Sequence, residues 1–391
     1  MSDRPLKIAV IAGEVSGDLL GADLIAQLKV MHSRPIELVG VGGDALEAQG
    51  LKSLFDFSEL SIMGFTQVLS KLPRLIKLIS ITADAIVKAE PDLLLVVDSP
   101  DFTHRVAKKV RSKRPDLPVI NYVCPSVWAW KEYRAKAMLG YVDAVLAVLP
   151  FEPAVMQRLG GPETHFVGHR LSSHPDIRRV RQARQARGPR PLGSKRTILL
   201  LPGSRGGEIT QLLPIFGEAM QEFVTRNGET RFILPTVARQ EARVREITRD
   251  WPTRPEIVVG DAAKWQAFEE ADAAIAASGT VILELALAYV PVVSTYKGDW
   301  IIQMLSHRIK IWTGALPNLI ADYAVVPEYF NDVLRPASLV RWAERLSLDT
   351  PQRTAMLSGY DEVWRKLETE RPAGEAGAAV VLSVLEKRGK L

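Results

Sequence analysis

The sequence has little cysteine: Cys124 is the single one among 391 residues. This excludes a disulfide framework and a zinc site built from cysteines, and Cys124 is expected to be a small buried hydrophobic residue. No uncharged apolar run approaches the roughly 18 residues that a membrane-spanning helix needs. The first residues show no signal-peptide pattern, so we expect a cytoplasmic protein.

Motifs for metal and nucleotide triphosphate binding are also missing. The sequence has no D-x-D, no histidine pair at ligand spacing and no Walker sequence. We therefore expect neither a metal site nor a cofactor. Lys and Arg number 50 against 45 Asp and Glu, a net charge of +5. This mild excess permits nucleic acid, anionic lipid or phosphorylated substrates as partners and selects none of them.

Two segments of the sequence begin alike. The apolar run over residues 7–13 ends in glycine and precedes a helical pattern through Lys29, and the run over 197–203 does the same before a helical pattern from about Glu208. Each predicts a buried strand, a tight turn and a helix, the opening unit of a doubly wound α/β domain. Further runs predict a parallel sheet in each half: Ile36–Val41, Leu93–Val97, Val119–Val123 and Ala144–Val148, then Arg231–Leu234, Ile257–Val259, Ala273–Ala276 and Val290–Ser294.

These patterns divide the chain into α/β domains over 1–176 and 197–360. Residues 177–195 between them carry seven basic side chains and no acid. This segment is either a nucleic-acid patch or a solvated, partly helical linker, and the lack of interleaved aromatics favours a linker over 177–196. The helices over 361–391 are expected to pack back on the first domain or on a partner subunit. Two such domains facing each other would leave a cleft at the carboxyl ends of both sheets.

Two turns of the second half are suited to phosphate. Gly203, Ser204 and Arg205 follow a strand, where glycine allows close approach and arginine matches phosphate oxygens. A plain tight turn is the alternative. The turn Ser278-Gly279-Thr280 precedes a helix whose free amides could hold a diphosphate, with Ser278 or Thr280 as the cap. Glu284, one turn further, stands among apolar neighbours, which favours a bound ribose over a solvated helix charge.

Carboxylates mark the first half. Asp98 ends a buried strand, where it is either a general base or a turn residue, and Asp101 is expected to cap the following helix.

The glycines of the segment from Gly13 to Asp18 do not match G-x-G-x-x-G, so we discount a nicotinamide site. Hydroxyl recognition suits Glu14 and Asp18 better, with Gly13, Ser16 and Gly17 beside them. The alternative is that Ser16 and Asp18 are helix caps.

An amphipathic stretch covers residues 65–79, with lysine and arginine interleaved and Pro73 expected to begin a second helix. A core helix is the usual interpretation, but the apolar positions exceed one sheet-facing stripe, so a membrane contact or lipid-binding groove is the alternative. The candidate acyl or membrane contacts are Phe65, Val68, Leu69, Leu72, Leu75 and Ile76.

The ordered set of motifs resembles the lipid-A-disaccharide synthase family. It comprises Gly13-Glu14-Val-Ser-Gly-Asp18, Val41-Gly-Gly43, Ile62-Met-Gly-Phe65, Asp98-Ser-Pro-Asp-Phe102, Pro125-Ser-Val-Trp-Ala-Trp130, Val167-Gly-His169, Leu201-Pro-Gly-Ser-Arg205, Ser278-Gly-Thr-Val-Ile-Leu-Glu284, Tyr296-Lys297 and Leu316-Pro-Asn318. Val15 departs from the family's frequent alanine. The resemblance implies a GT-B fold with two Rossmann-like domains and an inverting transfer from UDP-2,3-diacylglucosamine to 2,3-diacylglucosamine 1-phosphate.

The resemblance also implies roles and a location. Asp98 would be the base for the acceptor hydroxyl, and Glu14 and His169 are the alternative bases, ranked below it. Glu14 would lie near the acceptor. Asn318 would belong to the donor site. Because both substrates carry acyl chains, the resemblance implies peripheral association with the inner membrane and favours the lipid-contact interpretation of residues 65–79. Two alternatives stay open: a UDP-sugar epimerase on the same fold, and a nonenzymatic nucleotide-sugar or nucleic-acid binder that uses the arginine-rich segment.

Overall fold

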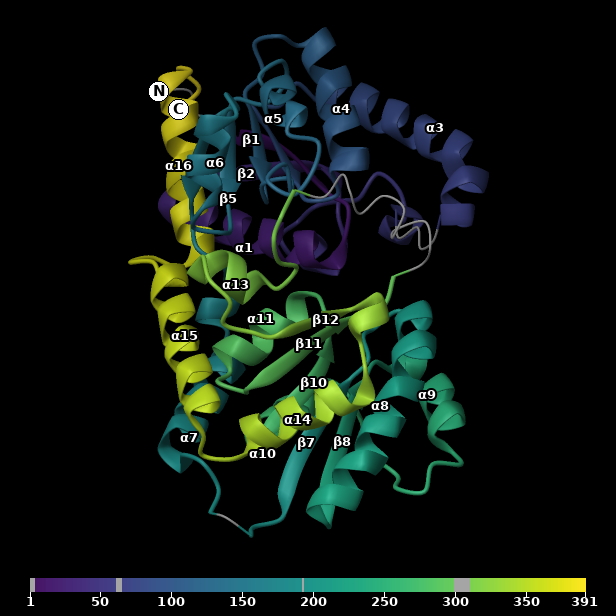
Figure 1. The fold of residues 1–391 in the computed structure, drawn as a ribbon. Coiled ribbons are helices and arrows are strands. Elements are labelled where there is room, and N and C mark those ends of the chain that lie inside the picture. Colours follow the sequence, from purple (N-terminus) through teal and green to yellow (C-terminus); the bar gives the residue numbers. More distant parts are fainter. Residues whose placement is uncertain (1–3, 61–64, 192, 299–309) are drawn as a thin grey trace. The chain divides into compact units, whose positions relative to one another are not determined.

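The computed structural model describes residues 4–60, 65–191, 193–298 and 310–391, without the side chains of residues 58 and 65–72. The chain forms two compact units, shown in Figure 1. The N-terminal unit comprises Met1–Arg170 and Thr369–Leu391, and the C-terminal unit comprises Leu171–Glu368. The short helix η2 (Arg170–Ser173) stands where the chain passes from one unit to the next.

The N-terminal unit contains a six-stranded parallel sheet in the order β2-β1-β3-β4-β5-β6. Its strands are β1 (Leu6–Ala12), β2 (Ile36–Val41), β3 (Leu93–Val97), β4 (Val119–Tyr122), β5 (Ala144–Ala147) and β6 (Glu163–Phe166). Its helices are α1 (Val15–Met31), α2 (Asp44–Ala48), η1 (Phe57–Leu60), α3 (Phe65–Ala89), α4 (Pro100–Lys113), α5 (Tyr133–Met138), α6 (Glu152–Arg158) and α16 (Ala373–Lys387). Apolar clusters cover both faces of the sheet, as expected where β3 is buried throughout.

The C-terminal unit has a second six-stranded parallel sheet, in the order β12-β11-β10-β7-β8-β9. Its strands are β7 (Arg196–Leu201), β8 (Thr230–Thr236), β9 (Glu256–Val259), β10 (Ala273–Ala277), β11 (Val292–Tyr296) and β12 (Glu328–Phe330). Its helices are α7 (Pro175–Arg187), α8 (Gly206–Asn227), η3 (Ala238–Gln240), α9 (Glu241–Thr248), α10 (Asp261–Glu270), α11 (Thr280–Leu287), α13 (Leu316–Ala321), η5 (Asn331–Val333), α14 (Pro336–Ser347) and α15 (Pro351–Leu367). The expected pair of Rossmann-like α/β domains is confirmed.

The last helix returns to the first unit. Ala378, Val381 and Leu385 of α16 are buried in the same apolar cluster as Leu24 and Leu28 of α1. The two helices are drawn side by side in Figure 1, in yellow and purple. Residues from the end of the chain therefore complete the core of the N-terminal unit.

The arginine-rich segment differs from a solvated linker. It contains the helix α7, in which Arg181 and Arg184 are buried. The guanidinium of Arg184 donates to the carbonyl oxygens of Tyr289 (2.8 Å) and Phe268 (3.1 Å) and to that of Ala271. These arginines can be buried because their guanidiniums donate to backbone carbonyl oxygens at the carboxyl ends of neighbouring elements. Charge composition alone does not predict this role.

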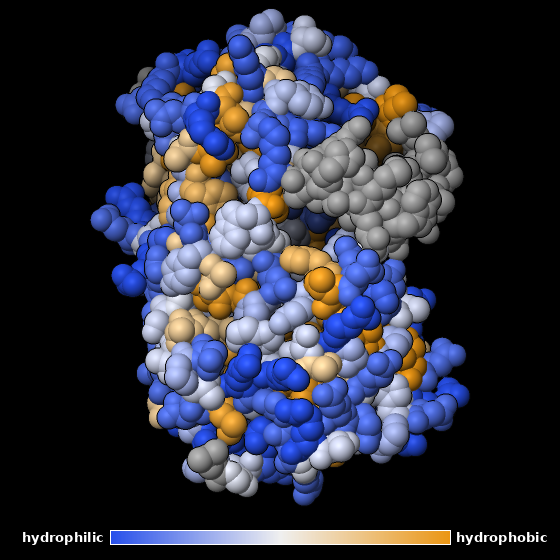
Figure 2. All heavy atoms as spheres, viewed as in Figure 1, coloured by the Kyte–Doolittle hydropathy of each residue, from blue (hydrophilic) through white to orange (hydrophobic). Residues whose placement is uncertain are grey.

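The described surface is of mixed character. On the face in Figure 2, hydrophilic residues predominate over much of the C-terminal unit, with smaller hydrophobic areas among them. Among the described residues, no helix combines the length and apolarity needed to cross a bilayer. Cys124 is buried, as expected.

Candidate substrate-binding sites

A cavity of about 540 Å³ lies in the C-terminal unit, at the carboxyl ends of β7, β8 and β10. Parallel α/β sheets bind ligands at this edge. The cavity gathers six residues that the sequence singled out from two separate turns: Gly203, Ser204, Arg205, Ser278, Gly279 and Thr280. The two turns therefore form one site, although 75 residues separate Gly203 from Ser278 in the chain.

The first turn is shaped by Gly203. Its φ of +102° lies in a region that side chains disfavour, and a Cβ atom there would collide with the Glu208 carboxylate. Glu208 in turn accepts hydrogen bonds from the Arg205 amide (3.3 Å) and the Arg205 guanidinium (3.1 Å). Arg205 itself is exposed at the start of α8. Its guanidinium is thus available to an anion at the mouth of the cavity.

The second turn leads into α11. Gly279 stands at the N-cap position and no side chain caps the helix, so the expected cap by Ser278 or Thr280 is wrong. The first amides of a helix have no partners within it. At this turn the Ile282 amide donates to the Gly279 carbonyl at 3.1 Å, and the amides that precede it are left for water or for a ligand. They favour an anion because of the helix dipole.

Glu284 has a partner that the sequence did not suggest. Lys264 of α10 lines the cavity, and its ammonium donates a hydrogen bond to Glu284 Oε2 at 3.2 Å. The Lys264 ammonium also lies 4.2 Å from the centre of the Trp265 ring and 3.8 Å from an Asp261 oxygen. The Glu284 carboxylate is half-buried and paired, which removes the cost of placing an acid in an apolar helix.

Thr236 is a second residue that sequence patterns missed. It ends β8 and lines the same cavity. Its hydroxyl oxygen is buried and has no hydrogen-bond partner within the described part of the chain. Buried hydroxyls are nearly always paired, so this one indicates a polar ligand or an ordered water. The signal available in the sequence was its position at the end of a strand, the same signal that identified Asp98.

In the N-terminal unit, Asp98 follows β3 directly. Asp98 and Ser99 both have left-handed backbones, with φ of +54° and +45°. Strained backbone of this kind costs about 1–3 kcal/mol per residue and concentrates at functional sites. The Asp98 carboxylate is half-buried and accepts the Ser99 amide at 2.7 Å. Ser99 is the N-cap residue of α4, so Asp98 is not that cap, and Asp101 lies within the first turn rather than at the cap position expected for it.

The loop after β1 packs against Asp98. A Cβ atom on Gly13 would overlap the side chain of Ser99, and one on Gly17 would lie 3.4 Å from Asp98 Cβ. Glycine is thus required where the loop crosses the end of β3. Glu14 and Ser16 stand exposed at the start of α1. The structure therefore brings Gly13, Gly17 and Asp98 together, with Glu14 and Ser16 on the surface of the same turn.

Two of the predicted site residues are buried in structural roles. The Asp18 carboxylate accepts the amides of Gly43 (2.7 Å), Ala45 (2.9 Å) and Leu46 (3.3 Å), so it caps α2 instead of its own helix. Asn318 donates to Thr313 and to the Val326 carbonyl and accepts the amides of Val325 and Val326. Both side chains hold turns in place, and the turn that Asp18 holds begins 25 residues further along the chain.

The remaining candidates are the acyl or membrane contacts of α3 and His169. Phe65, Val68, Leu69 and Leu72 have side chains outside the described part of the structure. Leu75 packs against the core, whereas Ile76 is 53% exposed. Helix α3 continues through Pro73, so the second helix expected there is wrong. Desolvation by the surrounding protein lowers the pKa of His169 to about 4, which makes this imidazole a weak base.

Comparisons with known proteins match the chain to one family over most of its length. The family model described as lipid-A-disaccharide synthetase matches residues 8–359. The lipid-A-disaccharide synthases of Rhodopseudomonas palustris (strain HaA2) and Rhodospirillum centenum are 44% and 38% identical to this chain, with coverage of 97% and 98% of this chain and 97% and 96% of the relatives.

Solved structures share the fold at low identity. An S. aureus MnaA–UDP co-structure has a TM-score of 0.62 at 14% identity, covering 98% of this chain and 97% of that one. MurG of Acinetobacter baumannii has a TM-score of 0.57 at 13% identity, covering 98% of this chain and 100% of that one.

Proposed function

This chain belongs to the lipid-A-disaccharide synthase family, and on that premise we propose how its residues carry out the family's reaction. The enzyme is a UDP-sugar-dependent glycosyltransferase of lipid A biosynthesis. It joins UDP-2,3-diacylglucosamine to 2,3-diacylglucosamine 1-phosphate and releases UDP. Because the donor is α-linked and the product has a β-1′,6 linkage, the anomeric centre inverts.

The cavity of the C-terminal unit is the proposed donor site. The UDP diphosphate would lie at the start of α11, where the first amides are uncapped, with Arg205 on its exposed side. Charge that develops on the departing UDP would be stabilised by these fixed dipoles and by the guanidinium. In this arrangement the phosphate charge is balanced by groups of the protein, so the reaction is expected to proceed without a metal.

Glu284 and Thr236 would recognise the nucleoside. A carboxylate can accept hydrogen bonds from two ribose hydroxyls, and Lys264 keeps the Glu284 carboxylate in one orientation from the neighbouring helix. The Thr236 hydroxyl supplies a further polar contact within the same cavity. We place Lys264 in a positioning role, because it acts on the nucleoside through Glu284.

Asp98 is the proposed base. The acceptor 6-hydroxyl attacks the anomeric carbon as the carbon–oxygen bond to UDP breaks, and the hydroxyl proton passes to the Asp98 carboxylate. The electron pair of the broken bond leaves with the UDP phosphate. General-base help of this kind contributes about 10²–10⁴ in rate. Glu14, exposed on the loop that packs against Asp98, would lie near the acceptor.

The acylated substrates suggest where the enzyme works. We propose peripheral association with the inner membrane through the apolar positions of α3, of which Ile76 is exposed on the described surface. An exposed apolar side chain flanked by Arg74 and Lys77 suits the boundary between acyl chains and anionic headgroups.

One observation supports this function most: in a member of this family, two phosphate-type turns line a single cavity together with Lys264, whose ammonium holds Glu284 at the cavity's edge. The decisive experiment is mass spectrometry of the products after incubation with the two acylated sugars. We expect the mass of the tetraacyl disaccharide 1-phosphate together with UDP. A product with the donor's own mass and an altered sugar would instead indicate an epimerase, and no product would contradict the proposal.

A further inference from the structure

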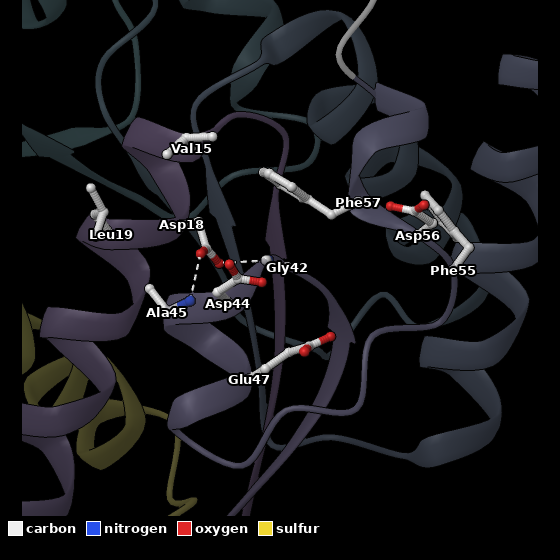
Figure 3. A pocket seen from close by; sticks show the side chains of 11 residues that line it. Val15, Asp18, Leu19, Gly42, Asp44, Ala45, Glu47, Phe55, Asp56 and Phe57 are labelled. Carbon is white, nitrogen blue, oxygen red and sulfur yellow. Dashed lines mark hydrogen bonds between the residues drawn. The ribbon is translucent and has the colours of Figure 1, made fainter. Parts of the chain in front are cut away.

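A second cavity, of about 730 Å³, opens in the N-terminal unit (Figure 3). Its walls come from the first turns of α1, from the β2–α2 turn with α2, and from the loop that leads into η1. Small-molecule sites typically occupy about 300–1,000 Å³ and are largely preformed. The cavity is therefore large enough for part of a substrate.

Hydrogen bonds within the protein fix the walls of this cavity, so the walls are formed without a ligand. Asp18 holds the β2–α2 turn through the Gly43 and Ala45 amides. Ser53 accepts the Gly42 amide of the same turn at 3.3 Å and donates to the Phe55 carbonyl at 2.9 Å, which ties the turn to the loop that leads into η1. The Phe55 ring packs edge-on against Phe102, with 6.3 Å between centroids. The cavity is thus built from anchored segments.

The lining near α1 is apolar and exposed. Val15 and Leu19 are 66% and 41% exposed, although they stand on a helix whose other side is buried in the core. Their spacing of four residues puts them on one face, one turn apart. Figure 3 shows both on the α1 side of the cavity, with Phe57 on the opposite side. Exposed apolar side chains that face a cavity indicate a ligand with hydrocarbon surface.

The cavity lies beside the proposed base. Gly17, in the same first turn as Val15, approaches the Asp98 side chain, so the turn has Asp98 on one side and the cavity on the other. In a 2,3-diacylated glucosamine the chains leave the ring at C2 and C3, at the far end from the 6-hydroxyl. A sugar with its 6-hydroxyl at Asp98 can therefore direct a chain over this turn.

Carboxylates on the remaining wall restrict what can enter. Asp44 and Glu47 line the cavity from α2 and Asp56 lines it from the loop before η1, in addition to Asp18, whose carboxylate is held by backbone amides. Their negative charge disfavours the acceptor's 1-phosphate, whereas their oxygens can accept hydrogen bonds from an acylamino N–H or a sugar hydroxyl. Apolar walls with carboxylates beside them therefore suit an uncharged acyl chain and its linkage and exclude a phosphate.

We propose that this cavity binds an acyl chain of the acceptor, 2,3-diacylglucosamine 1-phosphate. The inference rests on the proposed function, since it takes that reaction and Asp98 as given. The cavity then makes acceptor affinity depend on chain length. Each methylene that is buried adds about fourfold to affinity until the cavity is filled.

The test compares acceptors of different chain length in mixed micelles of constant composition. Acceptors with acyl chains of roughly 4 to 12 carbons are assayed against the wild type, Val15→Ser/Leu19→Ser and Val15→Trp. Both positions are exposed, so these variants are expected to fold. The matched control is Val30→Ser, at an 81% exposed position of the same helix outside the cavity.

We expect the acceptor KM of the double variant to rise at least tenfold for the longest chains and less than twofold for the shortest. Val15→Trp, which narrows the cavity, should show the same trend, and Val30→Ser should match the wild type. Equal dependence on chain length in wild type and both cavity variants would overturn the acyl site, as would a shift confined to the donor KM. Absence of disaccharide from the wild type would instead contradict the proposed function, so the two failures are distinguishable.

Discussion

The ammonium of Lys264 and the carboxylate of Glu284 are 3.2 Å apart and join α10 to α11 at the edge of the proposed donor cavity. The pair explains why an acid can stand in an otherwise apolar helix. It also gives Glu284 a fixed orientation without capping either helix.

The first prediction concerns this pair. Glu284→Ala should weaken UDP binding by about 10- to 100-fold, because hydrogen bonds to a charged acceptor are worth about 1.5–3 kcal/mol each. Lys264→Met should weaken UDP binding by a smaller factor in the wild-type background and by almost none in the Glu284→Ala background. Titration calorimetry measures all four affinities. Additive losses would show that Lys264 acts independently of Glu284.

The second prediction concerns the base. Asp98→Asn preserves shape and removes basicity, so kcat should fall by about 10²–10⁴ while UDP affinity stays near wild type. The control is Asp101→Asn, three residues along in the first turn of α4, which should change kcat less than about twofold. A wild-type rate in Asp98→Asn, with chemistry shown to limit turnover, would reject this base and direct attention to Glu14.

The third prediction concerns metals. We propose that the helix amides and Arg205 stabilise the charge of the diphosphate. Activity should therefore survive exhaustive chelation of divalent cations. Arg205→Gln should lower kcat by about tenfold or more, because it removes a charge-assisted contact to the leaving diphosphate. An activity that chelation abolishes and Mg²⁺ restores would show that the charge has been assigned to the wrong groups.

The fourth prediction concerns the membrane. Ile76→Ser should reduce binding to anionic liposomes without lowering Tm, because the side chain is exposed. Leu75→Ser, one residue earlier, should lower Tm, because Leu75 packs against the core. Leu69→Ser/Leu72→Ser is expected to behave like Ile76→Ser. Co-sedimentation and thermal unfolding separate the two effects, and a Tm loss in Leu69→Ser/Leu72→Ser with unchanged liposome binding would make those positions core.

The fifth prediction concerns pH. Burial raises the pKa of Glu152 to about 7, even though the carboxylate accepts the Leu149 amide and the Trp128 indole N–H. Since the folded-state pKa is raised, the folded protein binds more protons than the unfolded chain, and the free energy of unfolding falls as pH rises from about 4.5 to 7. Glu152→Gln should remove this contribution, on the order of 3 kcal/mol. Urea unfolding at pH 5 and pH 8 tests it: an identical pH difference in wild type and variant would contradict it.

Sequence patterns anticipated elements and turns better than they anticipated partners. The strands were predictable because buried parallel strands are continuous apolar runs, and the turns at Gly203 and Ser278 because glycine and hydroxyl residues follow such runs. The partner of Asp18 lies 25 residues further along the chain, at Gly43, and local periodicity carries no information on such pairings. Lys264 was missed for the same reason. It lies on α10, and its partner Glu284 lies on α11, with the strand β10 between the two helices.

The burial of α16 against α1 has a consequence for synthesis of the chain. Because Val381 and Leu385 belong to the cluster that contains Leu24, the first unit to leave the ribosome lacks part of its core until the last residues follow. At roughly 5–20 residues per second, the delay between residue 170 and residue 385 is on the order of 10–40 s. During that interval the nascent α1 exposes an apolar strip, and the intervening unit, which is continuous from Leu171 to Glu368, is complete in sequence before α16 is. The unit that is translated first is therefore the last to have its core complete.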